Sequence, residues 1–244
     1  MMNPINNSLL MIFDFDHTII EENSDIEIIN LLDSKSKIQL NKEYKSKGGW
    51  TEHMNNVFSE LYIQGYKKSD FESVLLPMNY VVGIEELISK YQNSKLYIVS
   101  DSNSWIIDFY LTNKGINVRN FFKEIFTNSA NFLDNNEDRI IIQPYHNPPQ
   151  KFCDKCPENM CKGSIVKEIM SRNSAYEAVC YFGDGKGDLC ACCNIQSPNV
   201  KSFAFVRKNF QLEKFKNLIE KNSVEVFLWT NGFDIMNILN SLGY

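Results

Sequence analysis

The sequence predicts an α/β fold: a doubly wound parallel sheet with an inserted helical cap. Short uninterrupted apolar runs, such as residues 9–13, are typical of parallel strands buried on both faces. Amphipathic helical segments alternate with these runs along the chain. Residues 23–82 carry helical periodicity only, and they are too many for an ordinary crossover between two strands. We therefore expect a core domain of residues 1–22 and 83–244 and a cap of residues 23–82.

The predicted cap is helical throughout. Apolar residues recur at helical spacing in residues 26–32, and Ser24 is a candidate N-cap for that helix. Further helices are predicted at residues 50–61 and 68–76. Glycines mark the turns between them, and Pro77 ends the last run.

Strands and helices alternate after the cap. The predicted strands cover residues 95–99, 122–127, 139–144, 178–182 and 202–206, and the predicted helices cover residues 82–91, 103–114, 162–170, 210–221 and 233–242. Apart from the strand at 139–144, residues 128–150 are predicted to be irregular. This alternation favours a parallel sheet with helices on both faces, in which ligands bind beyond the carboxyl ends of the strands.

Composition excludes several classes of protein. The chain of 244 residues has a net charge of −5, which argues against nucleic-acid binding because phosphate backbones require clustered Lys and Arg. No apolar run approaches the roughly eighteen residues of a membrane span, and residues 1–7 form a polar lead-in without a signal-peptide core. Seven cysteines without a signal peptide indicate reduced thiols, and therefore a cytoplasmic protein. The sequence specifies no oligomeric state.

Two carboxylates end the first predicted strand. Asp14 and Asp16 follow residues 9–13, and strand alternation points both side chains the same way, with Phe15 opposite. Two carboxylates this close repel each other unless a cation lies between them, and Mg²⁺ suits such a site. One carboxylate is then free to attack an electrophile and the other to carry a proton. By itself, however, this pair of aspartates could also simply end the strand and begin a polar loop without any catalytic role.

Three later stretches complete a set of four motifs. Ser100 ends the second predicted strand, Lys162 opens a predicted helix, and a glycine-rich loop with Asp184 and Asp188 follows a third strand. In order and spacing these motifs (DxDxT, strand-Ser, Lys and GDGxxD) resemble the haloacid dehalogenase superfamily of phosphatases. The resemblance implies phosphoryl transfer, in which catalysis is mostly positioning and charge neutralisation.

The same resemblance implies the catalytic roles. Asp14 attacks phosphorus and forms an aspartyl phosphate, while Asp16 protonates the leaving alcohol and later deprotonates the hydrolytic water. Asp14, the main-chain carbonyl of Asp16, and Asp184 bind Mg²⁺. Lys162 neutralises charge on the phosphoryl group, and Lys167 on the same helix is a competing candidate.

Other residues are expected to support these groups. By resemblance, Ser100 donates to a phosphate oxygen, and Asp188 either holds a metal-bound water or orients Lys162. Thr18 is expected to brace the first loop, and Gly183 and Gly185 are expected to let the backbone turn sharply at the metal loop.

A closer resemblance covers nearly the whole chain, residues 9–240. The segments ENSD at 22–25, WTEHM at 50–54, VSDSN at 99–103 and above all CPENMCK at 156–162 resemble the PHOSPHO family. That family contains phosphoethanolamine/phosphocholine phosphatase and pyridoxal phosphate phosphatase.

The PHOSPHO resemblance implies that Asn23, Ser100, Asp101 and Ser102 contact the substrate. A carboxylate such as Asp101 beside a phosphate site costs phosphate affinity unless it meets a cationic head group. The alternative for Asp101 is an N-cap of the following helix.

The predicted function is Mg²⁺-dependent hydrolysis of a small phosphomonoester, either phosphoethanolamine or phosphocholine, or pyridoxal 5′-phosphate. Thiamine monophosphate or another vitamin phosphate is an alternative substrate. A phosphoserine-type substrate is disfavoured because Asn23 replaces the glutamate that reads its amine. Transfer to an acceptor other than water, as in a mutase, stays open. A binding protein without activity would lack the nucleophile, and a cap of this size disfavours protein substrates.

The cysteine-rich stretch invites a second hypothesis. Cys153, Cys156 and Cys161 have the short spacing of zinc ligands, and His146 is a possible fourth. Phosphoryl transfer does not need such an ion, and a second CxxC pair is absent. Unbound thiols near the active site are therefore the favoured interpretation, and Cys190 is expected to pack a helix after the metal loop.

Overall fold

The computed structural model describes residues 9–47, 49–133, 136–173 and 176–244. The predicted polar lead-in at residues 1–7 lies outside this part of the chain. Within it, no helix combines the length and the apolar character that crossing a membrane requires.

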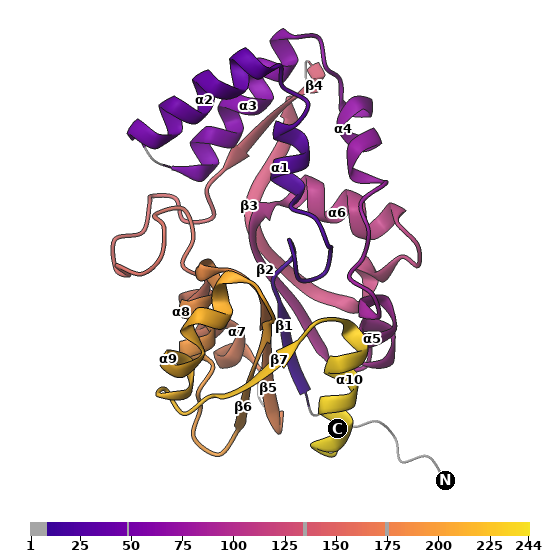
Figure 1. The fold of residues 1–244 in the computed structure, drawn as a ribbon, viewed down its shortest axis with the longest axis vertical. Coiled ribbons are helices and arrows are strands. Elements are labelled where there is room, and N and C mark those ends of the chain that lie inside the picture. The colour runs from indigo at the N-terminus through magenta and orange to yellow at the C-terminus, as the bar shows by residue number, and fades with distance from the viewer. Residues whose placement is uncertain (1–8, 48, 134–135, 174–175) are drawn as a thin grey trace.

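A seven-stranded sheet forms the centre of the described structure, in the order β4-β3-β2-β1-β5-β6-β7 (Figure 1). Adjacent strands run parallel except β3 and β4, which pair antiparallel. The predicted α/β fold with a mostly parallel sheet is therefore confirmed. The strands are β1 (Leu9–Phe13), β2 (Lys95–Asn103), β3 (Phe122–Leu133), β4 (Asn136–Gln143), β5 (Ala178–Gly183), β6 (Lys201–Arg207) and β7 (Glu225–Trp229).

Helices cover both faces of this sheet and also gather at one end of it. Near that end, beside the outer parts of β3 and β4, lie α1 to α4 (Figure 1). The α-helices are α1 (Ser24–Ile29), α2 (Ser34–Lys47), α3 (Trp50–Ile63), α4 (Lys68–Leu75), α5 (Ile84–Lys90), α6 (Ser104–Asn113), α7 (Lys162–Arg172), α8 (Leu189–Asn194), α9 (Lys216–Glu220) and α10 (Gly232–Ser241). Short 3₁₀ helices cover Val118–Phe121, Lys186–Asp188 and Gln211–Phe215.

Strand β1 is buried on both faces because its side chains alternate between two apolar cores. Leu9, Met11 and Phe13 belong to the core that includes residues of α5, α6 and α10. Leu10 and Ile12 belong to the core that includes residues of α7, α8 and α9. The uninterrupted apolar run thus follows from the central position of the strand.

The entry and the exit of the helical segment 23–82 lie side by side. Ile20 and Tyr80 form an antiparallel bridge, the Glu21 amide donates to Asn79 O at 2.9 Å, and the Val81 amide donates to Ile19 O at 3.0 Å. Two short connections therefore join this segment to the sheet at one place.

Some of the predicted elements need correction. Residues 128–150 are less irregular than predicted, since β3 continues to Leu133 and β4 covers Asn136–Gln143. Strand β7 was not predicted. The predicted helix at 210–221 begins as a 3₁₀ helix before α9. The N-cap of α1 is Asn23, which accepts from the Ile26 amide at 3.0 Å, and not Ser24.

The side-chain amide of Asn55 on α3 forms two hydrogen bonds with the backbone of β4, as a neighbouring strand would. Its Nδ2 donates to Ile142 O at 2.7 Å, and its Oδ1 accepts from the Ile142 amide at 2.7 Å. Since β4 is the last strand of the sheet, this side chain satisfies the backbone amide and carbonyl of Ile142 on its outer edge.

We expect Asn55→Ala to lower the free energy of unfolding by about 1–3 kcal/mol, because it leaves a half-buried backbone donor and acceptor without partners. The matched control is Asn56→Ala, an exposed neighbour on the same helix that should change stability by less than about 0.5 kcal/mol. Chemical denaturation measures both. Equal effects of the two variants would show that the pairing with β4 contributes nothing.

Candidate active site

The predicted site residues of the core meet where β1, β2 and β5 end. The Asp14 amide donates to Phe182 O at 2.9 Å, which extends the β1–β5 pairing by one residue and holds Asp14 beside the loop after β5. The β2–β3 register shifts between Val99 and Asn103, so Ser100 and Asp101 lie in an irregular part of their strand. Such irregularities redirect side chains at the edges of sites.

Lys162, the first residue of α7, lies buried between two carboxylates. Its Nζ is 2.7 Å from Asp14 Oδ2 and 2.8 Å from Asp188 Oδ1. Burial alone would lower the pKa of Lys162, but Asp14 and Asp188 outweigh burial and raise that pKa well above its ordinary value. Lys162 therefore carries its charge at the end of β1. Lys167, the competing candidate, is exposed.

Asp188 is fully buried, and the protein satisfies both of its oxygens. Oδ1 accepts from Lys162 and, at 2.7 Å, from the Tyr181 hydroxyl, while Oδ2 accepts from the Asp184 and Gly185 amides at 3.1 and 2.9 Å. Burial raises the pKa of Asp188, yet Lys162 and these hydrogen bonds together hold it below its ordinary value. The orienting role predicted for Asp188 is consistent with these contacts.

The glycines of this loop serve different purposes. A Cβ on Gly183 would lie 2.6 Å from Asp188 Cγ, so the backbone approaches that carboxylate more closely than any other residue allows. Gly185 has φ −100°, which any residue adopts, and it contributes its amide to Asp188. The sharp turn predicted at Gly185 is therefore not what the position requires.

Three carboxylates are close enough to share one cation. One oxygen each of Asp14, Asp184 and Asp188 lies within 4.8 Å of the others. Burial and the neighbouring Asp188 raise the pKa of Asp14 well above its ordinary value and that of Asp184 to about 8. Such mutual repulsion is relieved by a bound hard cation, and an all-oxygen donor set suits a divalent one. The Asp16 ligand predicted from the sequence is a main-chain carbonyl, and it stays a prediction.

Asp16 is held by the start of α1. Its Oδ1 accepts from the Ser24 amide at 2.8 Å. Burial raises the pKa of Asp16 to about 6, and the hydrogen bonds from Ser24 work against this rise. A carboxyl group with such a pKa exchanges a proton near neutral pH, which suits a group that acts as acid and then as base.

Other residues predicted for the site are Ser100, Ser102, Thr18 and Asp101, and they differ in burial and in hydrogen bonding. Ser100 is fully buried, and its Oγ accepts from the Ser102 amide at 3.3 Å. The Ser102 hydroxyl lies 3.1 Å from that of Ser24, so it joins β2 to α1. The Thr18 hydroxyl is buried without a hydrogen-bond partner in the described part of the chain. Asn103, and not Asp101, caps α6.

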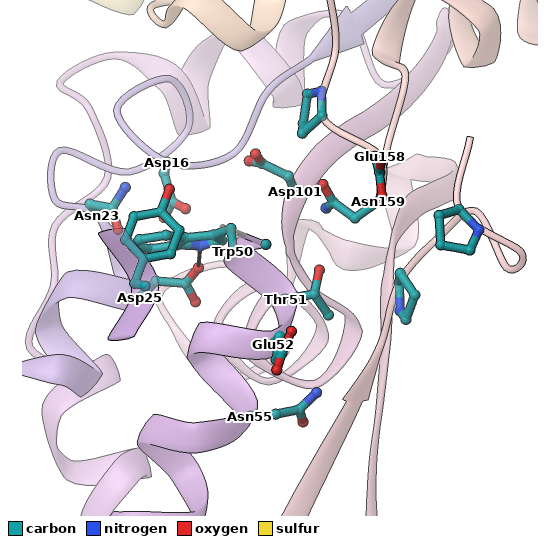
Figure 2. A pocket seen from close by; sticks show the side chains of 15 residues that line it. Asp16, Asn23, Asp25, Trp50, Thr51, Glu52, Asn55, Asp101, Glu158 and Asn159 are labelled. Carbon is teal, nitrogen blue, oxygen red and sulfur yellow. Dashed lines mark hydrogen bonds between the residues drawn. The ribbon is translucent and has the colours of Figure 1, made fainter. Parts of the chain in front are cut away.

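A pocket of about 850 Å³ opens beside this cluster (Figure 2). Its fifteen lining residues, all within the described ranges, include no Lys or Arg. Five of them are acidic: Asp16, Asp25, Glu52, Asp101 and Glu158. The predicted residues Asp101 and Asn23 line it as well, so the pocket is electronegative.

Asp25 and Trp50 also line the pocket, and the sequence analysis predicted no role for either of them. Trp50 Nε1 donates to Asp25 Oδ2 at 2.7 Å (Figure 2), and the other oxygen of Asp25 is buried without a hydrogen-bond partner among the described residues. Burial and the nearby Asp16 raise the pKa of Asp25 well above its ordinary value. Both residues lie in segments whose family resemblance is visible in the sequence, but that signal assigns no role.

Comparison with known proteins identifies the family. The sequence matches the family described as "Putative Phosphatase" over residues 9–242. The chain belongs to this family. It is 31% identical to human pyridoxal phosphate phosphatase PHOSPHO2, across 96% of this chain and 98% of that protein. It is 28% identical to chicken phosphoethanolamine/phosphocholine phosphatase, across 96% of this chain and 88% of that protein.

The fold of this PHOSPHO-family chain resembles that of phosphoserine phosphatase in a substrate-bound complex. The TM-score is 0.59 at 14% sequence identity, and the match covers 96% of this chain and 99% of that structure. The predicted membership of the PHOSPHO family is thus confirmed, and the fold agrees with the one that the resemblance implied. The phosphatase is a phosphoric monoester hydrolase, as predicted.

We expect Tyr181→Phe to destabilise the phosphatase by about 1.5–3 kcal/mol, because the lost hydroxyl donates to the buried charge of Asp188. Tyr97→Phe is the matched control on a nearby strand, since its hydroxyl contacts the neutral amide of Asn173. That loss should cost about 0.5–1.5 kcal/mol in the same denaturation experiment. An unchanged stability of Tyr181→Phe would mean that Lys162 alone satisfies Oδ1 of Asp188.

Proposed function

We propose that this phosphatase hydrolyses phosphate esters of small amine-bearing alcohols, with phosphoethanolamine and phosphocholine ranked before pyridoxal 5′-phosphate. The observation that carries the proposal is the pocket beside Asp14 and Asp16, which is lined by carboxylates and lacks Lys and Arg. A phosphate group gains nothing from such walls, whereas an ammonium group is attracted by them. The aromatic rings of Trp50 and Tyr44, which line the same pocket, suit an ammonium or a methylated ammonium.

The chain's own groups support a two-step mechanism. An Asp14 oxygen attacks phosphorus while the bond from phosphorus to the ester oxygen breaks, and Asp16 gives its proton to that oxygen. Asp16, now ionised, takes a proton from water, whose oxygen attacks the aspartyl phosphate and releases inorganic phosphate and Asp14. Ser100 and Lys162 are proposed to hold the phosphoryl oxygens, Lys162 because its charge lies 2.7 Å from the nucleophile.

A divalent cation, by proposal Mg²⁺, completes the site. Asp14, Asp184 and the carbonyl of Asp16 would hold it, with Asp188 beside them as the partner of Lys162. When bound, it neutralises negative charge on the phosphoryl group and keeps Asp14 ionised against its raised pKa.

Residues 23–82 are proposed to act as a cap that closes over the substrate. Two features support a hinge at residues 20–22 and 79–82: the connections lie side by side, and the Ser24 amide reaches Asp16 from the cap side. Closure would bring Asp25 and Trp50 against the head group and exclude bulk water from the phosphoryl group.

The proposed role of Asp16 predicts a dependence on the leaving group. Asp16→Asn should slow single-turnover cleavage of an alkyl phosphate by about 10²–10⁴-fold, because the alkoxide needs a proton. p-Nitrophenyl phosphate releases a phenolate that needs none, so this variant should give a burst of one p-nitrophenol per chain and then stall. Wild-type cleavage of the alkyl ester should also fall above a pH of about 6, as Asp16 loses its proton.

Asp14→Asn is the control for this experiment, since it should give neither burst nor turnover with either ester. Rapid-quench and stopped-flow absorbance follow the two substrates. A burst from Asp14→Asn, or equal loss of both cleavage rates in Asp16→Asn, would contradict the assigned roles.

The substrate proposal predicts the ranking of a panel of phosphate esters. With Mg²⁺ the phosphatase should prefer phosphoethanolamine or phosphocholine over propyl phosphate, and EDTA should abolish release of phosphate from all of them. Asp101→Asn should raise KM for the amine esters roughly 10–100-fold, because it removes a charge that contacts a cation. It should not raise KM for propyl phosphate, which carries no cation and gains from the loss of a nearby negative charge. Equal changes for charged and uncharged esters would refute a cation-reading role of Asp101, and a preference for pyridoxal phosphate would reverse our ranking.

A further inference from the structure

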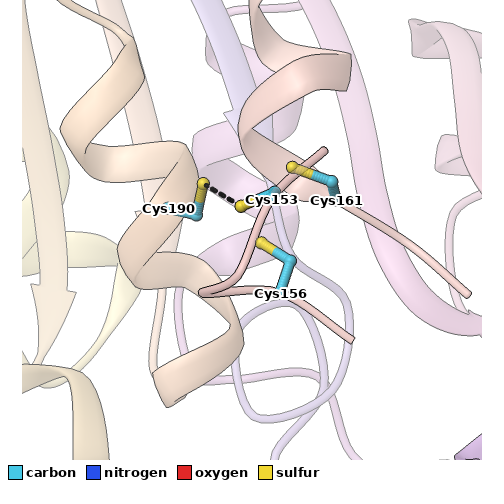
Figure 3. A group of neighbouring side chains, drawn as sticks. All are labelled: Cys153, Cys156, Cys161 and Cys190. Carbon is cyan, nitrogen blue, oxygen red and sulfur yellow. Dashed lines mark hydrogen bonds between the residues drawn. The ribbon is translucent and has the colours of Figure 1, made fainter. Parts of the chain in front are cut away.

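Four cysteines from three segments converge beside the active site (Figure 3). Cys153 and Cys156 belong to the loop before α7, Cys161 is the N-cap of α7, and Cys190 lies in α8. Their four Sγ atoms all lie within 4.8 Å of one another, and those of Cys153 and Cys190 are 3.8 Å apart. None of the four is in a disulfide. The sequence analysis considered His146 as a possible fourth ligand beside the first three cysteines, but the residue that the structure brings to them is Cys190.

These distances are those of a tetrahedral metal site. With zinc–sulfur bonds of about 2.3 Å, two sulfurs of a tetrahedral tetrathiolate lie about 3.8 Å apart. Disulfide bonding brings sulfurs together in pairs and gives no reason for four of them to converge on one point. A set of four soft ligands selects zinc over the hard cations that suit the carboxylates nearby.

The protein makes room for Cys190 at this point. A Cβ on Gly163 would lie 2.5 Å from Cys190 Sγ, so the first turn of α7 admits the thiol only because that residue is glycine. Asn194 Nδ2, one turn further along α8, lies 3.5 Å from the same sulfur and donates to it. Hydrogen bonds of this kind orient and stabilise metal-bound thiolates.

The loop that supplies two of the thiols is shaped by Gln150, which is buried. Its Nε2 donates to the carbonyls of Cys153, Cys156 and Pro157 at 3.0, 3.1 and 3.1 Å, and its Oε1 accepts from the Cys153 amide at 3.0 Å. Apart from Cys153 and Cys156, which are partly buried, residues 151–158 are exposed. This loop therefore has almost no apolar core of its own. Small units without a core are commonly held by a metal.

We propose that Cys153, Cys156, Cys161 and Cys190 bind one Zn²⁺ ion as a closed structural site. With four protein ligands the ion has no open position for substrate or water, so its role is structural and not catalytic. It would fasten the loop before α7 to α8. Because Cys161 precedes Lys162 and Cys190 follows Asp188 by two residues, the ion would also fix the two segments that carry this ion pair.

The experiment uses the full chain, purified under reducing conditions from cells supplied with zinc and without a chelator. Elemental analysis should find about one zinc per chain in the wild type. The zinc content per chain should fall at least tenfold in Cys153→Ser, in Cys156→Ser and in the double variant. Cys193→Ser, a partly exposed thiol in α8 outside the cluster, is the matched control and should retain it.

A second measurement covers the case in which the serine variants do not fold. The wild type loaded with Co²⁺ should show the intense near-ultraviolet thiolate-to-cobalt absorption of a tetrathiolate site, and Mg²⁺ in excess should not displace it. Wild type without zinc and without this absorption would overturn the proposal. So would zinc retained by the folded double variant, or a disulfide between two of the four cysteines in protein kept reduced.

Discussion

The buried ion pairs of Lys162 are the interaction on which the rest of the site depends. Burying several carboxylates at the end of a sheet is unfavourable unless cations compensate them, and Lys162 is the protein's own cation at that point. The arrangement is asymmetric. Asp188 accepts hydrogen bonds at both oxygens, whereas Oδ1 of Asp14 accepts only from the Phe15 amide among the residues that the structure describes. The charge of Lys162 is thus anchored by Asp188 and presented beside Asp14, the proposed nucleophile.

This asymmetry explains why the carboxylates differ although they lie so close together. Asp188 is held ionised by donors, whereas Asp14 and Asp184 have raised pKa values because burial and the charge of Asp188 oppose their ionisation. A site in this state has a deficit of positive charge that Lys162 alone does not remove. A phosphoryl group brings yet more negative charge, so under the proposed function a divalent cation would serve substrate binding as well as chemistry.

Much of this core could be predicted from the sequence, because β1, β2 and β5 are buried on both faces and their reactive residues directly follow apolar runs. Strand β7 was missed because its five residues form too short a run to be told from a helix segment. The position of Asp25 in the pocket wall was missed because Asp25 is held there by Trp50, which is distant in sequence and meets it through α1 and α3. Cys190 was missed for the same reason, since ligand spacing within one stretch says nothing of a thiol from another helix.

One stretch of chain, residues 150–162, joins the acidic pocket, the cysteine cluster and Lys162. Residues 157–159 line the acidic pocket, Gln150 shapes the loop that contains Cys153 and Cys156, and Lys162 follows that loop directly. A loop with exposed side chains and few apolar contacts is ordinarily free to vary its conformation by an ångström or more. Such freedom would be transmitted both to the pocket wall and to Lys162 beside Asp14, where small displacements would be costly for the proposed phosphoryl transfer. A rigid crosslink outside the active site is therefore the simplest way for a surface loop to position a buried charge.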